Sequence, residues 1–438
     1  MKNHSVSLRS FLMLWASQSV SAMGTAMTNY ALVIWVYSQN GTASSITSLT
    51  LCSFMPTILL RFTAGALADQ WDKKRIMLLS DLIAACGTMA VLALHASSAL
   101  MIVHLYAINF LMSCMNAFQV PAAYVATSLL VPKEHYARAG GLQAVSDAVI
   151  SILSPVLGSV VLAWGGLTAV LAIDLVTFAI AFLTLLAIRV PKIERAQQGK
   201  GESLWQSCLS GLRYLKAHSH LLRLILLIAA VNFLAKLGPD GQMPAFVLSR
   251  TQGSEAALGA VQSSVAVGLL CGGALVTVMK STANRTRMIL RMCSLIFLAG
   301  MALALSRYVI GWCAAAFLQY LFAAIMNVHW NALMRSTVPP QLQGRVFSAR
   351  DTIQSCTIPL GLYLGGVLTD KVFEPWMAYA SGMSPMLAYA FGEGSGAGIA
   401  LLFFLVSLAG FALSLACARS KRFQGPMDPT HEAAFHEN

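Results

Sequence analysis

Hydrophobic residues along this chain gather in runs that are long enough to cross a lipid bilayer, and short polar segments separate them. A helix needs about 20 apolar residues to cross the hydrocarbon core. The runs have no period-two alternation, and spans in lipid must satisfy their own backbone hydrogen bonds, so the pattern favours helices over a β-barrel. We expect an all-α membrane protein with twelve spans at 8–37, 46–68, 76–97, 99–124, 138–163, 167–189, 221–249, 257–280, 287–306, 309–334, 343–369 and 396–418.

Composition and charge agree with this class of protein. Hydrophobic residues make up 57% of the chain and charged residues 11%, whereas a soluble domain carries about 25% charged residues. The net charge is +12, and Lys and Arg concentrate in alternate loops, as in loops that stay in the cytoplasm. With an even number of spans, both termini are predicted to be cytoplasmic. Nucleic-acid binding is not expected, because the basic residues are divided among short loops.

Two short patterns recur in the second part of the chain. Gly65-Ala-Leu-Ala-Asp69 recurs as Gly273-Ala-Leu-Val-Thr277, and the pair Asp147 and Pro155 recurs at the same spacing as Asp351 and Pro359. The repeats fall in equivalent spans of two six-helix halves, which is the pattern of a duplicated membrane unit. The predicted divisions are a first half at 1–189, a cytoplasmic linker with an amphipathic helix at 190–220, a second half at 221–418 and a cytoplasmic tail at 419–438.

The seventh span carries three polar residues at a spacing of four, which places them on one helical face. They are Asn232, Lys236 and Asp240, with Gly238 and Pro239 between them able to break the helix. Ionisable residues inside a membrane are costly and mark functional sites by default. This face is our best candidate for a substrate or proton site. The alternative is an internal ion pair of Lys236 and Asp240 that only satisfies two buried charges.

Polar stripes on three further spans predict a central amphipathic cavity, with interhelical packing as the alternative for any one residue. Together with the seventh-span residues, its candidate lining is Gln18, Ser21, Thr25, Asn29, Tyr30, Asn109, Asn116, Gln319, Asn327 and Trp330. Asp147, Asp174 and Asp240 are candidates for proton coupling. For Asp147 a cytoplasmic gate pairing is preferred, as for Asp351, and for Asp174 a structural role is an equal alternative.

The charged turn between the second and third spans resembles the signature of the major facilitator superfamily. It reads Gly65-Ala-Leu-Ala-Asp69-Gln-Trp-Asp72-Lys73-Lys74-Arg75, with Gln70 and Asp72 in place of an Arg and a Gly of that signature. The segments 18–24, 173–178 and 344–348 resemble the macrolide- and siderophore-efflux branch of the superfamily. The fifth span resembles an antiporter element, although Ser154 and Ser159 replace glycines, and Met112 stands where proton-coupled exporters carry an Arg.

The resemblance implies a major facilitator fold of two pseudo-symmetric halves and a secondary transporter that works by alternating access. It implies proton-coupled efflux of small amphipathic compounds such as drugs, antibiotics or secondary metabolites, by a monomer in the inner membrane of a prokaryote. No cofactor is expected besides the proton gradient, and no metal. It further implies a cytoplasmic gate formed by Gly65, Asp69, Lys73, Lys74, Arg75, Arg345, Arg350 and Asp351.

Two other functions stay open at this point. One keeps the fold but makes the protein a facilitator or flippase for a lipid-like or siderophore-like metabolite. The other is a polytopic membrane enzyme, which is disfavoured because the sequence has no phosphate-binding loop, nucleophile elbow or metal-ligand cluster.

Overall fold

The computed structural model describes residues 8–131, 136–188, 212–278, 284–380 and 385–420, and every regular element in them is helical. The predicted all-α class is therefore confirmed. The predicted amphipathic helix of the linker and the predicted tail lie largely outside the described residues. The described part divides into two compact units, one of Met1–Lys200 with Pro244–Ser263, the other of Gly201–Met243 with Ser264–Asn438. The predicted halves stay a prediction, since the first unit includes residues 244–263 from the second half.

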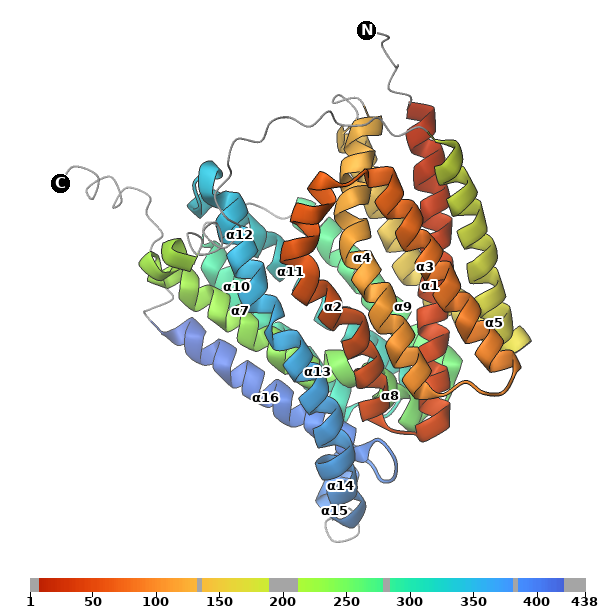
Figure 1. Cartoon of the computed structure of the whole chain (residues 1–438). Coiled ribbons are helices and arrows are strands. Elements are labelled where there is room, and N and C mark those ends of the chain that lie inside the picture. Colours follow the sequence, from red (N-terminus) through yellow and green to blue (C-terminus); the bar gives the residue numbers. More distant parts are fainter. Residues whose placement is uncertain (1–7, 132–135, 189–211, 279–283, 381–384, 421–438) are drawn as a thin grey trace, which may run out of the picture. The chain divides into compact units, whose positions relative to one another are not determined.

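The first unit contains five helices from the start of the chain, which are drawn in red to yellow in Figure 1. They are α1 (Leu8–Asn40), α2 (Ala43–Gln70), α3 (Lys73–Ala96), α4 (Ile102–Leu130) and α5 (Tyr136–Ala187). The long α5 holds two helices that join at Gly166, where φ is +63°, a backbone conformation that favours glycine. This junction lies between the predicted fifth and sixth spans, so both predicted spans correspond to helix.

Within the first unit, α1 packs along α5, while α4 packs against both α2 and α3. Two hydrophobic clusters hold these helices together. One includes Phe11, Ile76 and Leu185, and the other includes Leu32, Leu105 and Leu171. Because each cluster takes residues from distant parts of the chain, the helices form one packed body and not a row of independent spans.

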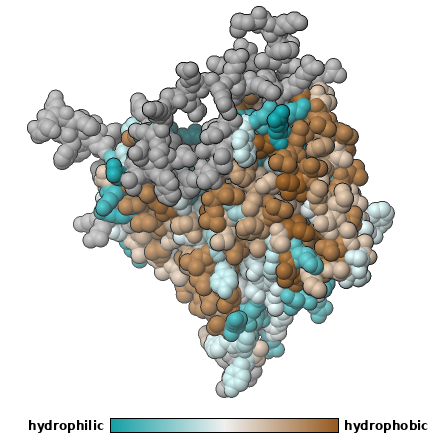
Figure 2. Space-filling view, in the orientation of Figure 1, coloured by the Kyte–Doolittle hydropathy of each residue, from teal (hydrophilic) through white to brown (hydrophobic). Residues whose placement is uncertain are grey.

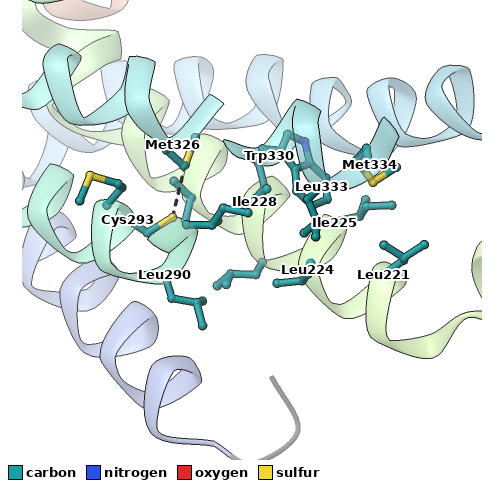
Figure 3. Close-up of a cluster of buried hydrophobic side chains, with 14 of the residues drawn as sticks. Leu221, Leu224, Ile225, Ile228, Leu290, Cys293, Met326, Trp330, Leu333 and Met334 are labelled. Carbon is teal, nitrogen blue, oxygen red and sulfur yellow. Dashed lines mark hydrogen bonds between the residues drawn. The ribbon is translucent and has the colours of Figure 1, made fainter. Parts of the chain in front are cut away.

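The second unit is built around three helices whose buried side chains interlock. Its elements are α7 (Ser219–Leu237), the part of α8 (Pro239–Arg250) up to Met243, the part of α9 (Glu255–Val278) from Ser264, α10 (Arg285–Leu305), α11 (Val309–Thr337), α12 (Pro340–Ser355), α13 (Thr357–Leu368), the π-helical turn η2 (Thr369–Phe373), α14 (Glu374–Ala380), α15 (Pro385–Phe391) and α16 (Ala397–Arg419). The first residues of α8, up to Met243, belong to the second unit, whereas the first residues of α9, up to Ser263, belong to the first unit. Figure 3 shows the core, in which Ile225 and Ile228 of α7 lie near Leu290 and Cys293 of α10 and near Trp330 of α11.

The number of membrane spans is partly supported. The described residues contain eight helical stretches that are long and apolar enough to cross a bilayer, and one of them, Ala139–Ala187, covers two predicted spans. Helices α1 and α4 are not among the eight, and both carry polar stripes. The count of twelve spans stays a prediction. Large apolar side chains such as Val160 and Leu183 are exposed, and Figure 2 shows broad hydrophobic areas on the surface, as expected where lipid is the solvent.

Candidate functional site

The second unit holds a charged cluster at a break between two helices. Lys236 lies in the last turn of α7 and Asp240 in the first turn of α8. The ammonium nitrogen Nζ of Lys236 is 2.7 Å from Oδ2 of Asp240, and the two side chains are 25% and 23% exposed. The hydroxyl of Tyr320, on α11, donates a hydrogen bond to Oδ1 of the same carboxylate. The structure thus joins the two predicted charges as a pair and adds a tyrosine to them.

Sequence reasoning missed Tyr320, although the chain contains a signal for it. A tyrosine hydroxyl in the middle of an apolar span needs a hydrogen-bond partner when it is buried. Tyr320 directly follows Gln319, which the sequence did single out as polar. The sequence does not show that Asp240 is this partner, because the two residues lie far apart along the chain. Only the packing of α11 brings Tyr320 and Asp240 together.

The helix break lies at two residues that both weaken a helix. Pro239 has no backbone N–H to donate, and Gly238 has φ −114° and ψ −121°, outside the helical region. Because of the break, Lys236 stands at the carboxyl end of one helix and Asp240 at the amino end of the next. Helix dipoles stabilise cations at the first kind of position and anions at the second. Each charge therefore has a stabilising helix end of its own.

Helix α13 approaches the backbone of α7 beside this pair through two glycines. A Cβ atom on Gly361 would lie 2.8 Å from the carbonyl oxygen of Phe233 and 3.1 Å from Cβ of Lys236. A Cβ atom on Gly365 would lie 2.5 Å from the carbonyl oxygen of Leu237. Small residues permit such close helix contacts in membranes. The glycines therefore let the end of α7, including Cβ of Lys236, lie directly against α13.

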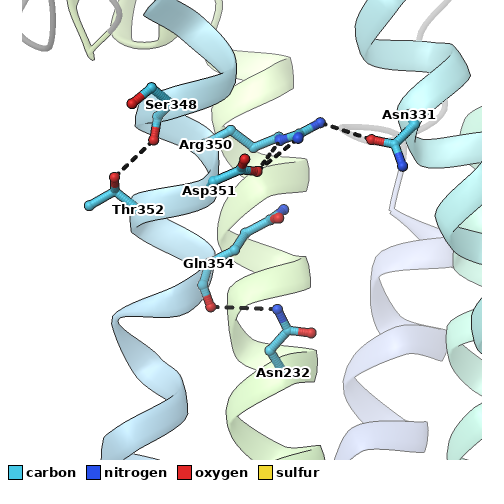
Figure 4. A network of polar contacts seen from close by, with 7 residues as sticks. All are labelled: Asn232, Asn331, Ser348, Arg350, Asp351, Thr352 and Gln354. Atoms are coloured by element: carbon cyan, nitrogen blue, oxygen red, sulfur yellow. Dashed lines mark hydrogen bonds and ion pairs between the residues drawn. The ribbon is translucent and has the colours of Figure 1, made fainter. Parts of the chain in front are cut away.

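A second polar network of this unit contains two of the predicted gate residues (Figure 4). Arg350 binds Oδ1 of Asp351 through Nε at 2.8 Å and through Nη2 at 2.7 Å. Its Nη1 donates to Oδ1 of Asn331 at 3.2 Å. Asn331 comes from α11 and was not predicted, so the network connects α12 to α11. Arg345 lies partly buried on α12, five residues before Arg350.

Asn232, the third residue of the predicted polar face, makes a different contact. Its Nδ2 donates to the carbonyl oxygen of Gln354 at 3.5 Å, a long hydrogen bond. The bond connects α7 to α12 and is visible in the lower part of Figure 4. Asn232 is thus used in helix packing, while Lys236 and Asp240 form the ion pair.

In the first unit, Asp174 is enclosed by hydroxyl groups. This residue of α5 is 3% exposed. It accepts hydrogen bonds from Thr25 and Thr28 of α1, both at 3.1 Å, and from Thr88 of α3 at 3.3 Å. Three helices therefore meet at one carboxylate. Thr25, predicted to line a cavity, has its hydroxyl directed to Asp174.

A second buried carboxylate of this unit was not predicted. Asp81, on α3, is 7% exposed and accepts hydrogen bonds from Nε2 of Gln18 at 3.5 Å and from Nε2 of Gln119 at 2.5 Å. Its position inside the predicted third span was the available signal, because a charge there is expected to be functional or paired. Gln18 of α1 is thereby a partner of Asp81.

The other predicted lining residues are scattered over different environments. Ser21 is partly buried, and Asn29, Asn116 and Asn327 are exposed. Asn109 is buried and donates from Nδ2 to the carbonyl oxygen of Leu105 at 2.9 Å. Gln319 is buried, and Trp330 lies inside the hydrophobic core of the second unit. Tyr30 is buried and donates its hydroxyl to the carbonyl oxygen of Glu255 at 2.5 Å. The central cavity itself stays a prediction.

The charged turn between α2 and α3 caps helices. Asp72 is the N-cap of α3 and accepts from the backbone N–H of Arg75 at 3.2 Å. Lys74 donates to the carbonyl oxygens of Leu186 and Ile188, at 2.9 Å and 2.7 Å, at the carboxyl end of α5. Lys73 donates to the carbonyl oxygen of Trp71 at 3.2 Å, and Arg75 is exposed.

Two remaining predictions concern the gate and proton transfer. The surroundings of Gly65 and the side chain of Asp69 lie outside what the structure describes, so their predicted role in the gate is not tested. Asp147 is exposed on α5 and accepts from Nε2 of Gln143 at 2.9 Å. Among the three candidates for proton coupling, Asp240 is the one that forms an ion pair with a lysine in the described part of the chain.

Several known proteins are similar to this chain. Macrolide efflux protein A of Streptococcus pyogenes is 26% identical over 371 residues, which cover 83% of this chain and 90% of that protein. The multidrug efflux pump Tap of Mycolicibacterium fortuitum is 25% identical over 376 residues, covering 82% of this chain and 88% of that protein. The enterobactin exporter EntS of Shigella flexneri is 26% identical over 353 residues, covering 79% and 80%.

Solved structures agree on the fold. A bacterial homologue of the human lysosomal transporter Spinster superposes with a TM-score of 0.69 at 16% identity, covering 95% of this chain and 98% of that one. The nucleoside transporter NupG superposes with a TM-score of 0.66 at 13% identity, covering 93% and 98%. The sequence profile of the Major Facilitator Superfamily matches residues 14–362. Because this match spans most of the chain, the protein belongs to the Major Facilitator Superfamily.

Proposed function

We propose that this protein is a secondary active transporter that exports small amphipathic compounds in exchange for protons. The fold and the three relatives named for efflux support the export of small compounds. The observation that carries the coupling to protons is the cluster of Lys236, Asp240 and Tyr320 at the α7–α8 break. Alternating access then opens this site to one side of the membrane and afterwards to the other.

The chemistry of the cluster suits the exchange of a proton for a positively charged partner. An ionised Asp240 attracts a cation and keeps Lys236 close, whereas a protonated Asp240 has lost that attraction. Proton binding therefore weakens the hold of the site on a positively charged partner. A carboxylate that serves both the proton and another ligand couples their movements, since occupation by one disfavours occupation by the other.

We propose that the protein works in a bacterial inner membrane. Its basic loops favour cytoplasmic termini, and its bacterial relatives favour the inner membrane of a prokaryote. The proton gradient supplies the energy, so the proposed transport needs no bound cofactor and no enzymatic reaction. We propose the monomer as the working unit.

The test is transport in proteoliposomes that contain the purified full chain and a labelled macrolide. We expect an imposed pH gradient to accelerate substrate movement and nigericin to abolish the acceleration. Asp240→Asn is expected to remove the gradient dependence, and the exposed Glu393→Gln is the matched control with wild-type behaviour. Transport at the same rate with and without a gradient would reject proton coupling and support a facilitator or flippase.

A further inference from the structure

Helices α14 and α15 extend from one end of the second unit and expose large aromatic side chains (Figure 1). We infer that this pair of helices is an interfacial anchor, in which Trp376, Tyr379 and Tyr389 bind the headgroup layer of the bilayer. The anchor lies on the side of the membrane where α10 ends and where α11 and α16 begin. The inference goes beyond the proposed function, because it assigns a lipid partner to a segment that takes no part in the exchange of substrate and proton.

Glu374 fixes the height of α14 in the membrane. Its Oε1 accepts the backbone N–H of Ile399 at 3.1 Å, and its Oε2 accepts the backbone N–H of Gly396 at 3.3 Å. These groups belong to the N-cap and the first turn of α16, where backbone N–H groups have no partner within the helix. A Cβ atom on Gly398 would collide with the backbone of Phe373 and Glu374, so glycine permits this close approach. Because α16 is long and apolar enough to cross a bilayer, the start of α14 lies at the boundary of the hydrocarbon core.

Arg307 attaches α15 at the same boundary. It lies in the short connection between Leu305, the last residue of α10, and Val309, the first residue of α11. Its Nη2 donates to the carbonyl oxygens of Ala388, at 3.2 Å, and of Tyr389, and its guanidinium carbon is 5.7 Å from the centre of the Tyr389 ring. Both α10 and α11 are long and apolar enough to cross a bilayer. Helix α15 is therefore held at the level where two further spans reach the headgroups.

The large side chains that stay at the surface of this pair are amphipathic. Trp376 is 49% exposed, Tyr379 is 74% exposed and Tyr389 is 82% exposed. Trp and Tyr have an apolar ring with a polar tip, and in membrane proteins they concentrate at the level of the headgroups. Figure 2 shows the lower tip of the molecule, formed by α14 and α15, in mostly pale colours of intermediate hydropathy. Intermediate hydropathy is what a segment between hydrocarbon and water requires.

The aromatic side chains continue the lipid-facing surface of the neighbouring spans. Helix α15 packs against α10 and α16. On these two spans Leu305 and Leu405 are exposed, and Tyr308 at the N-cap of α11 is exposed as well. An apolar band bordered by Trp and Tyr is the profile of a protein at a membrane boundary. This continuity identifies the lipid surface, and not a soluble protein, as the partner of α14 and α15.

Size and charge also fit the headgroup layer. This layer is about 5–8 Å thick on each side of the hydrocarbon core, and the seven residues of α14 rise about 10 Å. The sequence has no charged residue between Glu374 and Glu393. Because the anchor has no basic side chain of its own, it lacks the attraction that polybasic segments have for anionic lipid. Zwitterionic phosphatidylcholine is therefore a sufficient partner.

The test is quenching of the fluorescence of Trp376 by brominated lipid. The purified full chain is reconstituted in phosphatidylcholine whose acyl chains carry bromine either near the headgroup or near the methyl end. The chain has eight Trp residues, so the contribution of Trp376 is the emission of the wild type minus that of Trp376→Phe. We expect this contribution to fall about twofold with bromine near the headgroup and much less with bromine near the methyl end.

Trp312→Phe is the matched control. Trp312 lies in the first turn of α11, near the same boundary, but it is 3% exposed and donates to the carbonyl oxygen of Ser306 at 2.8 Å. Its contribution is expected to be insensitive to both brominated lipids. Tyr379→Trp adds a reporter to α14, so the test does not depend on the folding of Trp376→Phe. The added emission is expected to respond to the two lipids as that of Trp376 does.

Two results would overturn the anchor. Emission of Trp376 that iodide in the water quenches and brominated lipid does not would place α14 in the aqueous phase. Emission that neither quencher reaches would mean that protein, such as a second copy of this chain, covers the aromatic side chains. Neither result bears on the export assay, which measures the movement of substrate and not the position of α14.

Discussion

At the scale of single residues, buried carboxylates of the first unit explain much of the polar pattern of the first span. Gln18 binds Asp81, and Thr25 and Thr28 bind Asp174. A carboxylate in a low-dielectric interior is costly unless donors surround it. The stripe on α1 therefore serves interhelical packing at these positions, which was the alternative that the sequence left open. From the sequence, Thr25 was a candidate for the cavity lining and Asp174 a candidate for proton coupling. Nothing in the sequence indicated that the two side chains are hydrogen bonded.

The contribution of one such donor can be measured. Thr28→Val keeps the shape of the side chain and removes the hydroxyl that donates to Asp174. A hydrogen bond to a charged group contributes about 1.5–3 kcal/mol, so we expect the free energy of unfolding to fall by about that amount. Unfolding of the purified protein in mixed micelles is followed by circular dichroism. The control is Thr184→Val, whose hydroxyl binds the backbone of its own helix. Equal stability of the two variants would contradict the expected role of Thr28.

At the scale of elements, the broken seventh span and the glycines of α13 form one arrangement. Gly238 and Pro239 end α7, and Gly361 and Gly365 let α13 approach its last turns. The sequence predicted the break, because the residues that break helices are evident in it. The approach of α13 was not predicted, since glycines occur for many reasons and only packing identifies those that touch another backbone.

Adding one methyl group where α13 meets α7 is expected to disturb both the helix packing and the neighbouring Lys236–Asp240 pair. In Gly361→Ala the new Cβ would lie too close to the carbonyl oxygen of Phe233, so α13 must shift away from α7. Overpacking of this kind costs about 1–3 kcal/mol, and we expect slower transport together with lower thermal stability.

The control for this change is Gly273→Ala in α9, where the added Cβ would meet no atom within 4 Å beyond its chain neighbours and the backbone of its own helix. An alanine in the middle of a helix is more favourable than a glycine by about 0.5–1 kcal/mol, so this variant is expected to be as stable as the wild type or slightly more stable. Differential scanning fluorimetry and proteoliposome transport measure both quantities. A Gly361→Ala protein that matches the control in both would refute a close α7–α13 contact.

At the scale of the whole molecule, the first compact unit includes a segment from the later part of the chain. Residues 244–263 belong to the first unit, and specific contacts explain this. Tyr30 donates to the carbonyl oxygen of Glu255, and Ser263 donates to the carbonyl oxygen of Ile152 at 2.9 Å. A Cβ atom on Gly259 would lie 3.1 Å from the carbonyl oxygen of Pro155. The beginning of α9 is thereby attached to α1 and α5.

Removal of the tyrosine hydroxyl is expected to loosen this attachment locally. Tyr30→Phe keeps the ring and removes the hydrogen bond to Glu255. We expect faster hydrogen–deuterium exchange in peptides that cover 255–263, because local opening becomes less costly. Mass spectrometry of the purified protein measures the exchange, and peptides from Ala397 to Phe403 in α16 are the internal control. Unchanged exchange at 255–263 would mean that the hydroxyl does not hold α9.

The sequence by itself determined the properties that depend on solvent and on neighbours along the chain. Long apolar runs without period-two alternation favour helices in lipid, and Gly238 with Pro239 favours a helix break. Those constraints are local, so they can be read residue by residue. They predicted the class, the approximate spans and the proximity of Lys236 to Asp240, which lie one turn apart.

The tertiary structure decided which distant groups meet. Tyr320 reaches Asp240, three threonines from α1 and α3 enclose Asp174, and Gln119 reaches Asp81 only because particular helices are neighbours. Helix neighbours depend on side-chain packing over the whole unit, which no local pattern records. For this reason the sequence identified candidates for the site, and the packing decided which of them form ion pairs, which hold helices together and which stay exposed.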